Sequence, residues 1–203
     1  MKKNGYEGIY DWVCGHLAKA DLAECAPHLG LTVREDGKVS VSFFGREYLV
    51  DNQGVTPADG FPAGVNHLSL VGHYAMSRGR GEPAGEYVPL WRLSGTIDNS
   101  GGFDRSTVSN PLDRKFGSDL TALEQTAVRL GGVPQTDEPS GGLAWVFHAF
   151  PKVPIKLIHH PADEEFEAEY LLLFDKSADS FMVFEALGFL SGVFIHEMTS
   201  NDV

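Results

Sequence analysis

Residues 143–174, LAWVFHAFPKVPIKLIHHPADEEFEAEYLLLF, hold three largely apolar segments separated by short breaks. Leu143–Phe150 and Ile155–His160 are predicted strands, and Pro151-Lys152-Val153-Pro154 separates them. Glu169–Phe174 is a third predicted strand. Because connections this short leave no room for a crossover, we expect the strands to run antiparallel.

A second group of short strands is predicted upstream. Leu31–Arg34 and Lys38–Phe44 are joined by Asp36-Gly37, a dipeptide that tolerates the positive φ of a tight hairpin. Glu47–Val50 is a further short strand, which completes an antiparallel meander. Asp51–Gly64 is rich in Gly, Pro and Asp and is predicted to be a loop.

Helices are predicted where apolar side chains recur every three to four positions. The first helix has one apolar stripe, formed by Ile9, Trp12, Val13, His16, Leu17 and Ala20. Asp21 is expected to cap a second, short helix, and Ser118 to cap a helix that buries Leu120 and ends at Gly131-Gly132. A helix is also predicted from about Asn66. The closing helix, Ser180 to Met198, is expected to bury Val183, Phe184, Leu187, Leu190, Ser191, Phe194, Ile195 and Met198.

This order of elements indicates an α+β fold in which a largely antiparallel sheet packs with helices. We find no repeat or linker, so residues 1–203 are predicted to form one domain. Gly79–Pro111 is predicted to be a long irregular central segment in which only Tyr87–Leu93 is typical of a strand. Such a segment is either a functional loop or contains an element that the pattern does not reveal.

The composition excludes several classes of protein. With 16 basic and 28 acidic residues the formal charge is 16 − 28 = −12, which argues against a nucleic-acid binder. The longest apolar stretch, Ala186–Ile195, is too short to span a membrane. The start of the chain lacks the apolar run of a signal peptide, and two cysteines, Cys14 and Cys25, do not make a disulfide scaffold. We therefore expect a cytoplasmic protein.

The densest polar chemistry lies at His159-His160-Pro161-Ala162-Asp163-Glu164-Glu165-Phe166. Histidine and carboxylate together suit a divalent metal, but the spacing matches no established metal motif. Alternatively the carboxylates bind or catalyse, or Pro161 begins a helix whose first turn carries the acids. The candidate binding residues here are His160, Asp163, Glu164 and Glu165, with no metal ligand or catalytic residue assigned.

Three more residues, Arg46, His73 and Tyr74, lie near predicted element ends and are candidates for lining a pocket. Cys14-x-His16 and Cys25-x2-His28 offer four zinc-type ligands. Eleven residues on an unbroken helix span about 16 Å, so only a sharp bend between the two pairs would allow zinc, and we do not predict it.

Seven tracts carry a resemblance to a known family: Phe43-Phe44-Gly45-Arg46-Glu47-Tyr48, His73-Tyr74, Leu130-Gly131-Gly132, Phe150-Pro151, Asp163-Glu164-Glu165-Phe166, Leu173-Phe174-Asp175 and Glu185. Together they are similar to the prokaryotic domain-of-unknown-function family numbered 3786. The most specific part is the acidic run followed by Leu173-Phe174-Asp175. Family members often have Trp and Gly just before that run, where this chain has His159-His160-Pro161-Ala162.

The resemblance implies a context but no catalytic residues. Some members look fused to a four-cysteine iron–sulfur module of the kind found beside corrinoid proteins, which implies anaerobic redox or one-carbon metabolism. This chain lacks those cysteines, and two cysteines cannot supply the four thiolates of an ordinary cluster. We therefore expect no cofactor in the chain itself.

These observations favour a non-catalytic accessory or binding domain that acts with a protein partner of redox or one-carbon metabolism. The alternative is a small-molecule enzyme that uses Asp163, Glu164 or Glu165, with a metal held by His159 or His160. The closing helix also has a second apolar strip, formed by Phe181, Met182, Phe189 and Val193. We expect either a homodimer through this strip or its coverage by Gly79–Pro111.

Overall fold

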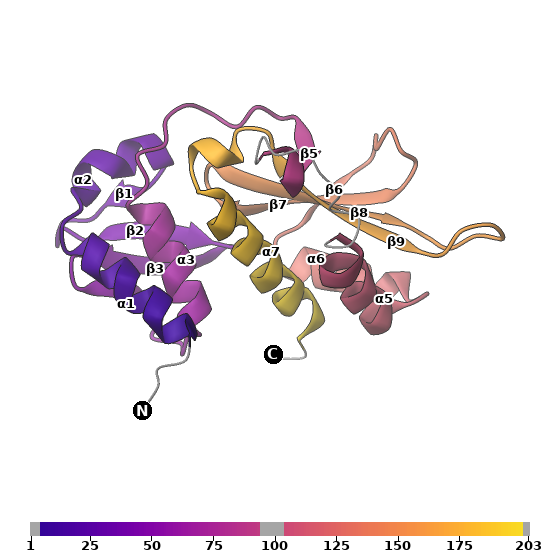
Figure 1. Cartoon of the computed structure of the whole chain (residues 1–203), viewed down its shortest axis with the longest axis horizontal. Coiled ribbons are helices and arrows are strands. Elements are labelled where there is room, and N and C mark those ends of the chain that lie inside the picture. Colours follow the sequence, from indigo (N-terminus) through magenta and orange to yellow (C-terminus); the bar gives the residue numbers. More distant parts are fainter. Residues whose placement is uncertain (1–4, 94–103, 201–203) are drawn as a thin grey trace.

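The computed structural model of the chain describes residues 5–93 and 104–200, which form two antiparallel sheets and a set of helices packed against them (Figure 1). The α-helices are α1 (Gly5–Leu17), α2 (Leu22–Cys25), α3 (Val65–Ala75), α5 (Asn110–Phe116), α6 (Leu120–Arg129) and α7 (Phe184–Thr199). The strands are β1 (Thr32–Val33), β2 (Val39–Phe43), β3 (Arg46–Asp51), β4 (Gly54–Pro57), β5 (Tyr87–Pro89), β6 (Val133–Gln135), β7 (Leu143–Phe150), β8 (Val153–His160) and β9 (Glu169–Asp175). The predicted α+β class is confirmed.

The smaller sheet is the predicted meander, in the order β1-β2-β3-β4. The turn between β2 and β3 places Phe44 at φ +46° and Gly45 at φ +76°. A residue with a side chain, such as Phe44, rarely adopts this left-handed conformation. The Phe44 N–H donates to the Ala149 carbonyl of the larger sheet at 3.1 Å. The expected loop over Asp51–Gly64 is wrong at Gly54–Pro57, because the Gly and Pro that bound this short strand resemble loop residues.

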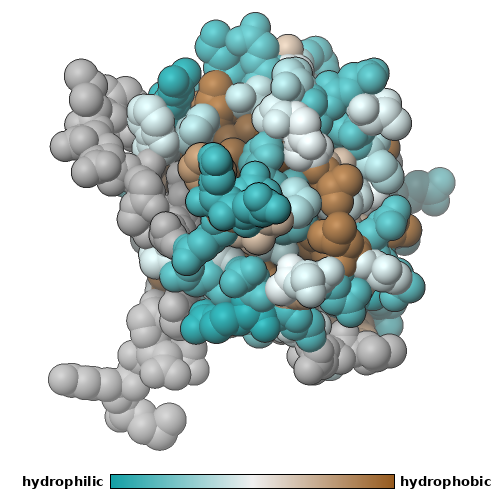
Figure 2. All heavy atoms as spheres, turned by 90° about the vertical axis from the view of Figure 1, so that its right-hand side faces the viewer, coloured by the Kyte–Doolittle hydropathy of each residue, from teal (hydrophilic) through white to brown (hydrophobic). Residues whose placement is uncertain are grey.

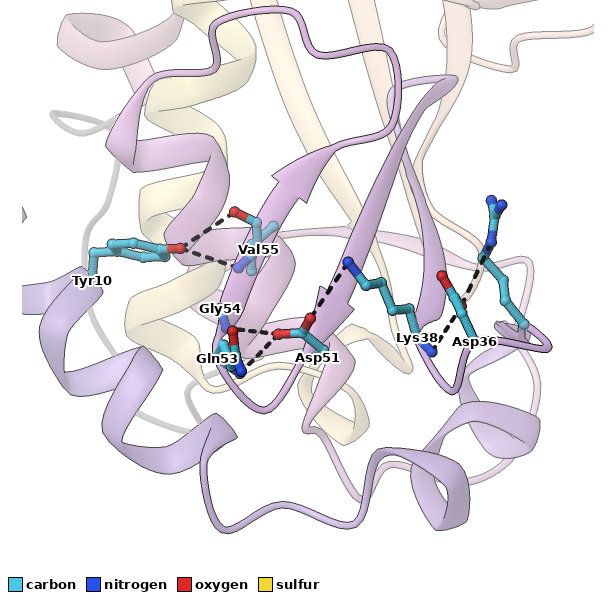
Figure 3. A network of polar contacts seen from close by, with 8 residues as sticks. Tyr10, Asp36, Lys38, Asp51, Gln53, Gly54 and Val55 are labelled. Carbon is cyan, nitrogen blue, oxygen red and sulfur yellow. Dashed lines mark hydrogen bonds and ion pairs between the residues drawn. The ribbon is translucent and has the colours of Figure 1, made fainter.

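A polar network fastens α1 to the smaller sheet (Figure 3). The Tyr10 hydroxyl accepts a hydrogen bond from the Val55 N–H at 3.1 Å and donates to the Val55 carbonyl at 3.4 Å. Asp51 Oδ1 accepts from the Gly54 N–H at 3.1 Å, while its other oxygen pairs with Lys38 Nζ at 3.6 Å. Each of these polar groups therefore has a partner.

The larger sheet has the order β5-β9-β8-β7-β6 and includes the three strands predicted from residues 143–174. β8 begins at Val153, inside the tetrapeptide predicted to separate two strands. Pro154 is tolerated there because it pairs with His148 next to a register shift, where a missing N–H does little harm. The short edge strand Val133–Gln135 was not predicted.

Helices α5, α6 and α7 lie along one side of the larger sheet, whereas α1 and α3 pack on the smaller sheet, and α7 contacts both α3 and α5 (Figure 1). The segment predicted to be irregular contains β5 and a π-helical turn, Asp104–Ser109, and α5 begins at its end. Pro111, the last residue of that segment, is the second residue of α5 and follows the π-helical turn.

Aromatic side chains join the two sheets into one hydrophobic core. Phe43 of the smaller sheet stacks on Phe150 of the larger sheet with ring centroids 4.6 Å apart. Phe194 of α7 contacts Phe44 at 5.7 Å and Phe147 at 4.8 Å. This shared core makes the fold a single domain.

The second apolar strip of the closing helix is covered within the chain. Phe181, Met182 and Val193 are buried, and Phe189 is half-buried. Gly79 packs so closely that a Cβ there would lie 2.4 Å from the Ser180 carbonyl oxygen, and Leu90 reaches Gly188. The described parts of the central segment thus lie against part of this strip, and the homodimer stays a prediction.

Several helix details differ from the predictions. In α1 only Val13 and Leu17 of the predicted stripe are fully buried, whereas Ile9 and Trp12 are exposed, because α1 packs on α3 and β4 along a narrow line. The residues Val183 and Phe184 at the start of α7 are also exposed, since they precede its contacts with the core.

At α6 the cap is one residue later than predicted. Asp119, not Ser118, accepts the Ala122 N–H at 2.9 Å, and Leu120 is largely exposed. The predicted cap at Asp21 is confirmed, since its carboxylate accepts the Glu24 N–H at 3.0 Å. Within the described residues, none of the helices has both the length and the apolar character needed to cross a bilayer.

Candidate functional site

A cleft lies between α5 and the hairpin formed by β8 and β9, and its volume is ≈ 1330 Å³. One wall comes from Ser109 to the start of α6, and the other from the end of β8, the connecting loop and the start of β9. Five carboxylate residues line it: Asp113, Asp163, Glu165, Glu167 and Glu169. Figure 2 looks onto this end of the molecule and shows mostly hydrophilic side chains around smaller hydrophobic patches.

Residues 161–169, which we call the acidic arm, connect β8 to β9 and project beyond the helices (Figure 1). Asp163 Oδ1 accepts the N–H groups of Glu165 and Phe166, both at 2.8 Å, and these bonds hold the pKa of Asp163 below its ordinary value. The arm is a turn rather than the helix start considered from the sequence. Phe166 is 70% exposed on it.

The floor of the cleft is a pair of buried aromatic rings. His159 and Tyr170 are directly opposed on β8 and β9, and their ring centroids lie 4.2 Å apart. Their side chains are 1% and 0% exposed, yet His159 Nδ1 and the Tyr170 hydroxyl have no hydrogen-bond partner. An unsatisfied buried polar group costs about 1–3 kcal/mol, so two in contact are a marked feature.

Ser109 fixes the other wall of the cleft relative to this floor. Its hydroxyl donates to the Tyr170 carbonyl at 3.1 Å and accepts the Tyr170 N–H at 2.8 Å. Asp113 follows four residues later, one helical turn along the same side, because residues i and i+4 are neighbours on a helix. The Ser109 bonds thus hold the wall that carries Asp113 against the start of β9.

The protonation states of the floor follow from burial and from Asp113. Burial lowers the pKa of His159, while a hydrogen bond to the Glu169 backbone and the charge of Asp113 oppose that shift. Burial raises the pKa of Tyr170 to about 12, and the negative charge of Asp113 adds to this shift. At neutral pH the floor is therefore an uncharged imidazole and an uncharged phenol beside a carboxylate.

The structure divides the residues predicted as binding residues among three places. His160, Asp163 and Glu165 line the cleft, whereas Glu164 is exposed on the acidic arm outside the lining. The cleft thus holds three of the four residues predicted in the acidic run.

The other three predicted residues lie elsewhere. The Tyr74 hydroxyl donates to the Leu29 carbonyl at 2.7 Å and accepts the Lys152 N–H at 3.1 Å, which is a structural role. His73, also on α3, lies beside the exposed Trp12 ring. Arg46 stacks over Phe61 with its guanidinium carbon 4.5 Å from the ring centroid, next to a shallow pocket at the β2–β3 turn.

Sequence reasoning missed Ser109, Asp113 and Tyr170. His159 alternates in phase with Ile155 and Leu157 along the strand, which marks it as inward-facing. Its pairing with Tyr170 depends on hairpin register, and Asp113 lies beside a segment in which no helix was predicted.

A metal site is not assembled in the described part of the chain, where no group of three His, Cys, Asp or Glu side chains is placed to hold an ion. Cys14 and Cys25 are free thiols. The described geometry therefore gives no residue set for the metal-assisted alternative.

Comparison with known proteins gives one family. The sequence model described as domain of unknown function (DUF3786) matches residues 21–197. The chain belongs to the DUF3786 family. The matched region of this DUF3786 protein runs from α2 into α7 and contains the whole cleft. No curated protein and no solved structure matches it significantly.

Proposed function

We propose that this DUF3786 protein is a non-catalytic binding domain that holds a positively charged segment of a protein partner in the cleft beside the acidic arm. The observation that carries the proposal is the pair of buried, unpartnered polar atoms at the floor of a carboxylate-lined cleft. Native proteins seldom leave two such atoms side by side without hydrogen-bond partners, unless a ligand or an ordered water supplies them.

The charge of the site supports a basic ligand. The acidic arm contains five acidic residues and no Lys or Arg, and among the described residues lining the cleft there is also no Lys or Arg. Complementary charge speeds encounter and selects the partner, and the net charge of −12 extends the attraction beyond the site.

The exposed Phe166 supports a protein rather than a simple ion as the ligand. Aromatic side chains are enriched in protein interfaces, because they bury much area at little entropic cost. Phe166 lies on the projecting arm between Glu165 and Glu167, where a partner that pairs with the acids also covers the ring.

The arrangement of the acidic run favours binding over acid–base catalysis. Paired-carboxylate catalysis needs two carboxylates directed at one reacting group. Asp163 is engaged with two backbone N–H groups, and Glu164 lies outside the lining of the cleft.

The family resemblance supplies the expected setting, which is the cytoplasm of an anaerobic prokaryote and a partner from redox or one-carbon metabolism. Co-purification of the chain with a corrinoid or iron–sulfur protein encoded beside it tests this part of the proposal. Separately purified chain is expected to be colourless, and stoichiometric iron in it contradicts the expectation.

The binding test uses fluorescence anisotropy with a short labelled peptide that alternates lysine and glycine, and the same peptide with glutamate in place of lysine. The lysine peptide should bind and lose affinity between about 50 mM and about 300 mM salt, whereas the glutamate peptide should not bind.

Charge-neutralising variants locate the site. Glu165→Gln/Glu169→Gln should weaken binding of the lysine peptide about tenfold, which equals about 1.4 kcal/mol. Glu24→Gln/Glu35→Gln removes the same charge from exposed positions at the far end of the molecule and should change the affinity little. Equal weakening by both pairs would show that the net charge, and not the cleft, attracts the peptide.

A further inference from the structure

We infer that the floor of the cleft is a recognition pocket for one cationic side chain of the partner, a lysine ammonium or an arginine guanidinium, held by Asp113, His159 and Tyr170. This inference rests on the proposed function and adds the specific contact that the partner makes. Nothing in the acidic arm alone requires such a pocket.

The first step is the clustering of unsatisfied polar atoms. Five side chains of the described residues have a buried polar atom without a hydrogen-bond or ion-pair partner: Asn66, His73, Trp145, His159 and Tyr170. Of these, only His159 and Tyr170 line the cleft, and their rings are in contact with each other. The two unsatisfied polar atoms therefore belong to adjacent residues of one cleft and lie just beneath its surface.

The second step is the chemistry that the two atoms offer. His159 Nδ1 has no partner in the chain, and in a neutral imidazole whose proton is on Nε2 this nitrogen accepts a hydrogen bond. The Tyr170 hydroxyl both accepts and donates. Asp113 adds a carboxylate close enough to act on both groups. The floor is therefore rich in acceptors and suits a ligand group that carries several N–H donors.

The third step excludes other ligand groups. An anion meets Asp113 and the acidic arm and is repelled. A neutral apolar group leaves His159 Nδ1 and the Tyr170 hydroxyl unsatisfied, which a binding site avoids. A lysine or arginine side chain supplies donors, neutralises Asp113 and carries an apolar stem that packs on Leu120 and Leu171 at the wall of the cleft.

The decisive variant is Tyr170→Phe, which removes only the hydroxyl. Because that hydroxyl has no partner in the chain, the variant should melt no lower than the wild type. We expect it to bind the lysine–glycine peptide about fivefold more weakly, which is the effect of one lost hydrogen bond. Tyr87→Phe, on the same sheet but outside the cleft, is the matched control and should bind like the wild type.

A second variant and a set of small probes complete the test. Asp113→Asn changes an exposed residue and should weaken the peptide without affecting the melting temperature. By NMR titration, the N-acetyl methylamides of lysine and arginine should shift the His159 ring signals, and the norleucine derivative should not.

The outcomes separate this inference from the proposed function. If the peptide does not bind the wild type, both fall. If it binds the wild type, Tyr170→Phe and Asp113→Asn with equal affinity, then the acidic arm alone binds it and the pocket is refuted. Equal shifts with lysine and norleucine derivatives also refute it.

Discussion

Strand β9 has a fully buried polar side chain near each end, Tyr170 and Asp175, and the two differ in their hydrogen bonding. Asp175 accepts four hydrogen bonds: from the N–H groups of Ala84 at 2.9 Å, Gly85 at 2.7 Å and Ser177 at 2.9 Å, and from the Ser177 hydroxyl at 2.7 Å. The hydroxyl of Tyr170, five residues earlier, has none.

This difference distinguishes a structural polar group from one kept available. Burial alone raises the pKa of Asp175, but the bonds from Ser177, Ala84 and Gly85 outweigh it and hold that pKa below its ordinary value. The carboxylate therefore fastens the loop before β5 to the larger sheet. The Tyr170 side chain makes no such bond, so its hydroxyl adds no hydrogen-bond stabilisation.

The largest effect is expected from Asp175→Ala. It leaves four donors without their acceptor, and hydrogen bonds to a charged group are strong, so the free energy of unfolding should fall by about 3 kcal/mol. Urea denaturation followed by tryptophan fluorescence measures this. Ser177→Ala, which removes one donor only, should lose about 1 kcal/mol. Equal losses in the two variants would contradict the role assigned to Asp175.

A matched pair of tyrosines gives the next effect. Tyr74→Phe removes a hydroxyl bonded to Leu29 and Lys152 and should lower the free energy of unfolding by about 1.5 kcal/mol. Tyr170→Phe should leave it unchanged or raise it. Thermal melts of both variants test the contrast, which does not survive if Tyr170→Phe is the less stable of the two.

A smaller effect comes from pH. Burial in the folded state lowers the pKa of His159 from its ordinary value of 6.5. As the pH falls, His159 is therefore protonated in the unfolded chain before it is protonated in the folded chain. The free energy of unfolding falls as the pH drops below about 6.5, until the folded-state pKa is reached. His159→Phe should lose less stability than the wild type between about pH 7 and about pH 5. Parallel curves for the two proteins would exclude His159 as the cause.

The smallest effect is expected at the surface of the N-terminal network in Figure 3. Lys38 and Asp51 form an ion pair at 3.6 Å with both side chains substantially exposed. Exposed pairs contribute little, so Lys38→Gln should lower the free energy of unfolding by no more than about 0.5 kcal/mol. A loss as large as that of Tyr74→Phe would mean that this network is as important as the buried bonds.

The fold could be predicted where the local sequence pattern agrees with the tertiary packing. β7, β8 and β9 were recognised because strand-forming residues run between clear breaks. Two prolines misled the prediction: Pro154 lies inside β8 next to a register shift, and Pro111 is the second residue of α5, after a π-helical turn. In both cases the local geometry around the proline is visible only in three dimensions.

The site was predictable only in part, for a similar reason. His160 and the acidic arm are continuous in sequence, so His160, Asp163 and Glu165 could be found. The floor combines β8, β9 and α5, and no spacing rule links Asp113 to His159 or Tyr170. Their proximity depends on hairpin register and on the bonds made by Ser109.

The contact between Phe44 and Phe194 sets a condition on synthesis. These rings lie 150 positions apart in the chain, yet they complete the same core. The meander that carries Phe44 is synthesised before α7. At typical elongation rates the interval between the two is roughly 10–30 s. Throughout that interval Phe44 lacks its contact with α7, so the nascent chain is most open to aggregation, and to chaperone binding, until α7 emerges and packs.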